Sequence, residues 1–186
     1  MSAAPSGSPA ASGSPAPQPT PEPDPTPRLG FTTTILGRQH VPANQPVTYP
    51  FCPPTSGDHY AQPVAPIPAR FYAANEEKSP ALWIHNLEHG YVVLAYRCPT
   101  GTPGTGDCPT DAEMAQMQAF FDQAPNSAVA ACPKKVLVVR FDEMSTRFGM
   151  LAWGRALLTD QFDLDTALTF AEQWMDHEVV PERGSC

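Results

Sequence analysis

Residues 91–96 read Tyr91-Val92-Val93-Leu94-Ala95-Tyr96, an unbroken apolar run that follows Gly90. The run is too short for most helices and is rich in residues that favour strands, so it predicts a central strand covered on both faces. Residues 136–139 predict a second buried strand, and residues 150–153 predict a third. We expect residues 82–84 to form a short strand or a single helical turn.

Two helices are predicted around these strands. Thr110-Asp111-Ala112-Glu113 has the form of a capping box, and apolar residues then recur at helical spacing until Pro125. Asp163 can cap a last helix that carries one apolar stripe. The order of strand, helix, strand, strand and helix indicates an α+β fold. We expect a small, mainly antiparallel sheet packed with two helices and joined by long ordered loops.

The N-terminal segment differs in composition from the rest of the chain. Nine of the 24 prolines lie between Pro5 and Pro27, and no large apolar side chain separates them. Such a segment has nothing to bury, so we expect residues 1–28 to be a disordered Pro/Ala/Ser-rich tether with polyproline II character. Residues 29–186 are then expected to form a single α+β domain.

The charge and the cysteines limit the possible partners and compartments. Asp and Glu outnumber Lys and Arg by 19 to 11, and no basic cluster is visible, so nucleic acid is not expected as a partner. Five cysteines without a Cys-x-x-Cys motif indicate disulfides in an oxidising compartment. Cys98 and Cys108 flank a flexible loop and are expected to pair. A second bridge would join two of Cys52, Cys132 and Cys186 and leave one thiol outside it.

The start of the chain suggests how the domain is held in place. Met1 runs directly into Ser2-Ala3-Ala4-Pro5, so no signal peptide is visible. A tether of this type is typical of the region that follows the acylated cysteine of a bacterial lipoprotein. We therefore expect that a leader has been removed and that Met1 stands in place of that cysteine. The domain would then be periplasmic, anchored to the outer membrane or secreted.

Four of the five histidines, His40, His59, His85 and His89, lie in one part of the chain. Imidazole is the commonest metal ligand, and two histidines four residues apart lie on one side of a helix or a strand. If the segment enters the following strand in extended form, His85 and His89 share a face while Glu88 points the other way or into a bend, where it would orient a ligand or form a salt bridge.

These residues predict a metal site. His85 and His89 would form its base and His59 the third ligand, while His40, His177 or Met150 would complete it. Imidazoles with a possible thioether favour copper, and zinc is the alternative. The expected function is copper sequestration or delivery.

Two other functions stay open. The first is an enzyme that uses a zinc or copper ion for hydrolysis or redox chemistry, with Glu88 as the base. The segment His85-Asn86-Leu87-Glu88-His89 matches the His-x-x-Glu-His pattern of zinc peptidases, in which the glutamate activates water. That chemistry needs a long helix and a third ligand further along the chain, so the sequence favours a binding protein over a hydrolase. The second alternative is an interaction module whose histidines hold no ion.

Several separated motifs occur in a fixed order. They are His40-Val41-Pro42, residues 53–60, residues 85–90, Ala152-Trp153-Gly154, and His177 with Pro181-Glu182. In these motifs the sequence from about residue 38 to residue 183 resembles the bacterial domain-of-unknown-function family numbered 3105.

The resemblance implies an exported or membrane-anchored protein. It also implies that the motif histidines of the family correspond to five positions here: His40, His59, His85, His89 and His177. Met150 departs from the pattern, where a small polar residue is expected, and the loop between Cys98 and Cys108 looks like an addition.

Overall fold

The computed structural model describes Met1, residues 28–132 and residues 134–186. A five-stranded sheet forms the centre of this part, in the order β1-β7-β6-β4-β5. Only β4 and β5 pair in parallel among these described strands, and all other neighbours are antiparallel. The bounds are β1 (Phe31–Thr32), β4 (Val92–Tyr96), β5 (Val136–Arg140), β6 (Phe148–Ala152) and β7 (Arg155–Thr159). The mainly antiparallel sheet confirms the predicted α+β fold. The tether predicted for residues 1–28 lies outside the described residues, apart from Met1 and Arg28.

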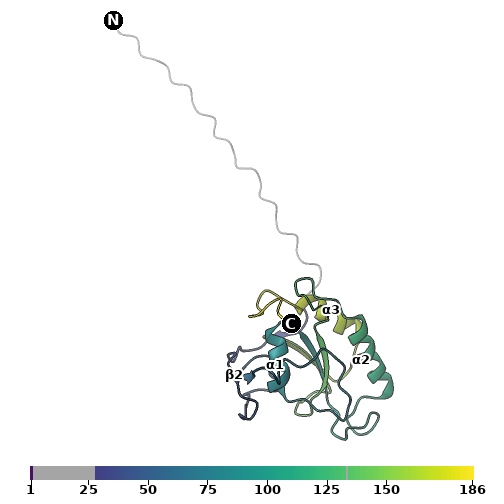
Figure 1. Cartoon of the computed structure of the whole chain (residues 1–186). Helices are drawn as coiled ribbons and strands as arrows, with labels where there is room; N and C mark the ends of the chain where they lie inside the picture. The colour runs from purple at the N-terminus through teal and green to yellow at the C-terminus, as the bar shows by residue number, and fades with distance from the viewer. Residues whose placement is uncertain (2–27, 133) are drawn as a thin grey trace.

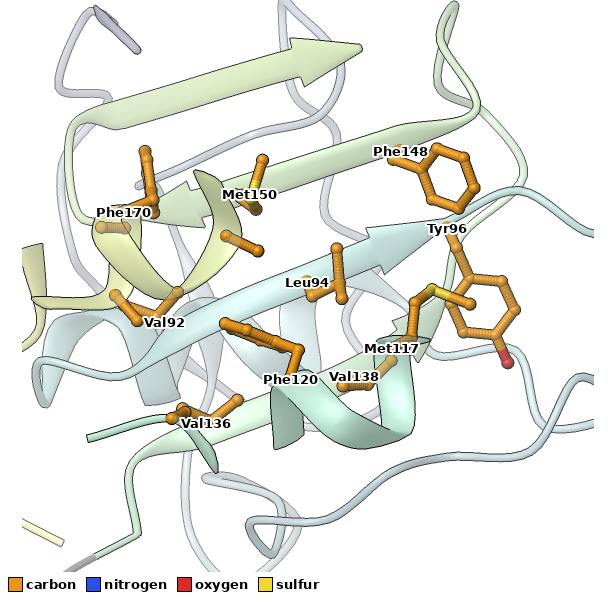
Figure 2. Packing of buried hydrophobic residues seen from close by; sticks show 14 of the residues in the cluster. Val92, Leu94, Tyr96, Met117, Phe120, Val136, Val138, Phe148, Met150 and Phe170 are labelled. Atoms are coloured by element: carbon orange, nitrogen blue, oxygen red, sulfur yellow. The ribbon is translucent and has the colours of Figure 1, made fainter. Parts of the chain in front are cut away.

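Helices cover both faces of the sheet (Figure 1). On one face, Val92, Leu94 and Tyr96 of β4 join a hydrophobic cluster with residues of α2 (Asp111–Gln123) and α3 (Leu164–Trp174), as Figure 2 shows. The alternate residues Val93 and Ala95 pack on the other face with α1 (Pro80–Glu88). All five residues of β4 are buried because both faces are covered, which is why the strand reads as a continuous apolar run.

The helix α1 is a correction to the prediction. A short strand or a single turn was expected at residues 82–84, with an extended segment after it, but the chain is helical up to Glu88. The Ser79 side chain accepts a hydrogen bond from the backbone N–H of Ala81, and Pro80 occupies the first turn. Both residues are typical of a helix N-terminus, so the sequence does contain a signal for the start of α1. Gly90, at a φ of 91°, then reverses the chain into β4.

The remaining elements follow the prediction, with one addition. The helix α2 begins with the predicted capping box at Thr110, and Asp163 caps α3. The strand expected at residues 150–153 is β6. Its hairpin partner β7 was not predicted, because Arg155–Thr159 is only half-buried and lacks a strong apolar run. Gly154, at a φ of 70°, makes the turn between these two strands.

The cysteines pair as the sequence suggested. Cys98 is bonded to Cys108 and Cys132 to Cys186, while the thiol of Cys52 is free and exposed. The second disulfide ties the C-terminal residue to the segment that precedes β5. No helix in the described ranges has the length and apolar character needed to span a membrane.

The carboxylate of Glu113 helps to attach α2 to the sheet, and its contribution to the free energy of unfolding can be measured. The carboxylate receives two hydrogen bonds from Arg147, at 2.7 and 2.8 Å, and the pKa of Glu113 is lowered by these bonds and by that from Thr110. A lowered pKa stabilises the fold above the pKa of the unfolded glutamate, and the effect is lost as the pH falls through the folded value. We expect Glu113→Gln, which keeps the capping box, to lower the free energy of unfolding by up to about 1 kcal/mol at about pH 7.

The difference between this variant and the wild type should shrink once the pH falls below about 4. Urea unfolding at both pH values measures it. An equal difference at neutral and acid pH would contradict a contribution from the ionised carboxylate.

Candidate metal centre

Two short strands bring the first two histidines together. β2 (His40–Val41) and β3 (His59–Tyr60) pair in parallel, and His40 lies directly opposite His59. Paired residues in neighbouring strands point to the same face of a sheet, so both imidazoles project in one direction. The pairing is fixed by backbone hydrogen bonds of 3.0 Å from His59 to Gln39 and from Ala61 to Val41.

The last turn of α1 supplies the other two residues. His85 and Glu88 are three positions apart and therefore share one face of the helix. His85 Nδ1 donates a hydrogen bond of 2.8 Å to the backbone carbonyl of Tyr60, which fastens α1 to β3. The helix thus presents an imidazole and a carboxylate to the same space as His40 and His59.

The four side chains form one compact group. One donor atom from each of His40, His59, His85 and Glu88 lies within 4.8 Å of every other. Glu88 Oε2 is 3.0 Å from His59 Nε2 and 3.4 Å from His40 Nε2. A tetrahedral ion with bonds of about 2.05 Å separates its donor atoms by about 3.3 Å, so small side-chain rotations suffice to close the group around one ion.

The hydrogen bonds fix which nitrogen atoms are free to bind. His59 Nδ1 lies 2.8 Å from the carbonyl of Gly57, and His85 Nδ1 bonds to Tyr60. A carbonyl oxygen only accepts, so each Nδ1 carries a hydrogen and each neutral ring keeps its lone pair on Nε2. This is the form in which an imidazole binds a metal, with a backbone carbonyl orienting the ring.

When His59 is neutral and its hydrogen is on Nδ1, no hydrogen atom lies between His59 Nε2 and Glu88 Oε2, whereas a protonated His59 can donate to this carboxylate. Both atoms are buried, and neither has a hydrogen-bond partner within the part of the chain that the structure describes. When His59 is neutral, two electron-rich atoms therefore approach to 3.0 Å in a buried site. Such an arrangement is costly unless a cation lies between the two atoms.

Burial and charge set the protonation states. Burial lowers the pKa of His85, which favours the neutral imidazole that a metal needs. For Glu88, burial alone would raise the pKa, but the interactions with His59, His40 and His85 outweigh it and hold the pKa below its usual range. The carboxylate is therefore ionised at neutral pH and can act as an anionic ligand.

Glu88 lies with the histidines because the segment is helical and not extended. It would point away from the histidines or into a bend if residues 85–89 were extended. In a helix, positions three apart and positions four apart both lie on one face, whereas in a strand only even spacings share a face. The spacing of His85 and Glu88, read together with Ser79-Pro80, is the signal that could have identified the carboxylate.

His89 lies beside the group but not in it. As the C-cap of α1 it leaves the helix face, and its Nε2 lies 3.1 Å from Glu182 Oε2. Its ring packs edge-on against that of His85 at 4.7 Å between centroids. The group that the structure brings together therefore contains His85 with Glu88, while His89 lies next to it.

The structure does not bring Met150 or His177 to the group. Met150 is buried in the cluster between the sheet and the helices α2 and α3, on the face of the sheet opposite α1 (Figure 2). His177 follows α3, stacks on Trp174, and has its Nε2 2.7 Å from the Arg28 side chain.

The fold and the site together define an α+β domain in which three histidines and a glutamate could hold one metal ion. Residues 40–186 match the family described as Protein of unknown function (DUF3105), and the chain belongs to that family. The match confirms the predicted resemblance, and it includes all four residues of the group. Comparisons with curated proteins and with solved structures found no match.

Proposed function

We propose that this protein binds one divalent transition-metal ion through His40, His59, His85 and Glu88, and that it sequesters or delivers this ion. The observation that carries the proposal is the buried approach of His59 Nε2 to Glu88 Oε2, two atoms that lack hydrogen-bond partners in the described residues. A metal ion satisfies both atoms at once. The hydrogen bonds from His59 and His85 to backbone carbonyls support the proposal, because they keep the hydrogen of each neutral ring on Nδ1 and leave the Nε2 lone pair free to bind a metal.

The ligand set favours Cu(II), with Zn(II) as the alternative. Three imidazole nitrogens and one carboxylate suit transition metals, whereas Mg²⁺ and Ca²⁺ prefer oxygen ligands throughout. Among divalent ions of the first row, Cu(II) binds a given set of nitrogen and oxygen ligands most tightly. Met150 is buried in the hydrophobic cluster on the face of the sheet that α2 and α3 cover. Its thioether is therefore not near the four residues, and the preference for Cu(I) that such a ligand would give does not apply.

The same set favours binding over hydrolysis. Four protein ligands complete a tetrahedral sphere, as in structural sites, whereas catalytic zinc sites keep one position for water. The peptidase interpretation needs Glu88 beside the metal as a free base, and here Glu88 lies among the donor atoms themselves. Its helix also ends at Glu88, which leaves His89 paired with Glu182.

An extracytoplasmic location is part of the proposal. The two disulfides support an oxidising compartment, where such bonds form and persist. The tether expected at residues 1–28 would connect the domain to a lipid anchor at the membrane, so that the site could meet its donor or acceptor near the surface.

Metal titration of the full chain tests the proposal. Calorimetry with CuCl₂ and separately with ZnCl₂ should show a single ion per chain, with Cu(II) bound more tightly. The variant His177→Ala should bind in the same way, because His177 contacts Arg28 and Trp174 and not the group. Loss of stoichiometric binding in His177→Ala, or no binding by the wild type, would contradict the proposed site.

A further inference from the structure

We propose that His40 is the exchangeable ligand, so that the ion enters and leaves by ligand substitution at the edge formed by Arg38 and His40. This inference rests on the proposed metal-binding function and assigns different roles to the four ligands. The other three residues would hold the ion while His40 opens and closes the site.

Exposure separates His40 from the rest of the group. The side chains of His59 and Glu88 are 0% and 1% exposed, whereas that of His40 is 42% exposed. His85 is also buried. Among the four donors in the described part of the chain, His40 is the exposed one, so we expect an incoming ligand to reach the ion from its side.

Hydrogen bonds to the backbone also separate the ring of His40 from those of His59 and His85. Nδ1 of His59 and Nδ1 of His85 are each held by a backbone carbonyl. Within the described residues, the His40 ring makes no hydrogen bond to the backbone at Nδ1, and it lies against Glu88 and the rings of His59 and His85. Rotation of the His40 side chain away from the ion therefore breaks no hydrogen bond to the backbone.

Arg38 suggests the chemistry of the exchange partner. Its guanidinium group lies 3.8 Å from Glu88 Oε1 and is 56% exposed, at the same edge as His40. A positive charge there repels a free aqueous cation and attracts an anionic ligand, although solvent screens both effects. The edge thus suits a donor or acceptor that presents the metal with carboxylate or thiolate groups.

The exchange step needs no redox partner. The bond from His40 Nε2 to the ion would break first, and one donor atom of the incoming ligand would then bind at the vacated position, with no change in the oxidation state of the ion. His59, His85 and Glu88 then release the ion as further donor atoms of the acceptor bind. Loading follows the same steps in reverse.

Stopped-flow transfer of Cu(II) from the full chain to EDTA, an anionic chelator, tests this order. In the wild type, the rate should reach a plateau as EDTA is raised, because His40 must leave before the chelator binds. The variant His40→Ala should still bind one ion per chain. Its transfer should be at least about tenfold faster at high EDTA and should rise in proportion to the EDTA concentration.

Two matched variants complete the design. His85→Ala should lose stoichiometric binding, since it removes a ligand that the backbone holds in place. Arg38→Gln should slow transfer to EDTA at concentrations below the plateau but leave the plateau rate and the transfer to neutral 2,2′-bipyridine unchanged. Transfer from His40→Ala that still reaches the wild-type plateau, or loss of the ion from His40→Ala but not from His85→Ala, would overturn the inference while leaving the metal site in place. A wild-type chain that takes up no ion would overturn the proposed function and this inference together.

Discussion

The variant Glu88→Gln is expected to bind Cu(II) more than about 100-fold less tightly than the wild type, since loss of an outer-shell partner alone costs 10–100-fold. Glutamine preserves the shape of the side chain but removes the negative charge that lies 3.0 Å from His59 Nε2 and 3.4 Å from His40 Nε2. The three imidazoles would then have to hold a divalent ion in a buried site without an anionic ligand. Calorimetric titration with CuCl₂ measures the change.

Glu182→Gln is the matched control for this prediction. The substitution is the same, and Glu182 also pairs with a histidine, but that histidine is His89, which lies outside the group of four. We expect Glu182→Gln to change the affinity by less than about tenfold. Equal losses in the two variants would show that general charge, and not the position of Glu88, controls binding.

The variant Lys135→Met is expected to lower the free energy of unfolding by about 3–5 kcal/mol, the range found when one partner of a buried ion pair is removed. Lys135 is fully buried, and its Nζ lies 2.6 Å from Asp176 Oδ1 and 2.6 Å from the carbonyl of His89. Among the described residues, the carboxylate of Asp176 would then keep its bonds from Ser127 and Gly184. Urea unfolding monitored by circular dichroism measures the loss.

Lys134→Met provides the comparison for Lys135. The Nζ of Lys134 donates to three backbone carbonyls at the end of α2, but its side chain is only partly buried. We expect a loss of about 1 kcal/mol, typical of a cation at a helix C-terminus. Similar losses in both variants would contradict the importance of the buried ion pair.

Strong local signals explain why most of the fold was predictable. The apolar run at residues 91–96 is short and rich in strand-forming residues, which favours a strand covered on both faces. The capping box at Thr110 marks the start of α2 without reference to the rest of the chain. The strand β7 could not be found in this way, because a half-buried strand takes its stability from pairing with β6, which local sequence does not encode.

The histidines of the site could be predicted from their spacing along the chain, but the position of Glu88 and that of Met150 depend on the fold. Clustering of histidines along the chain selected His40, His59 and His85, which the structure brings together. The role of Glu88 depended on whether residues 85–89 are helical or extended, and Gly90 was taken only as the start of a strand although it also ends α1. Met150 could not be placed without the register of β6 against β4, where it pairs with Leu94 and so faces α2 and α3.

Crystals of the full chain grown with Zn(II) or Cu(II), with anomalous diffraction recorded at the metal absorption edge, test the central claim most directly. The account predicts one anomalous peak at about 2.0–2.2 Å from Nε2 of His59, Nε2 of His85 and a carboxylate oxygen of Glu88, with His40 as the fourth ligand. A peak at His177, at the pair of His89 and Glu182, or nowhere near these four side chains would contradict it.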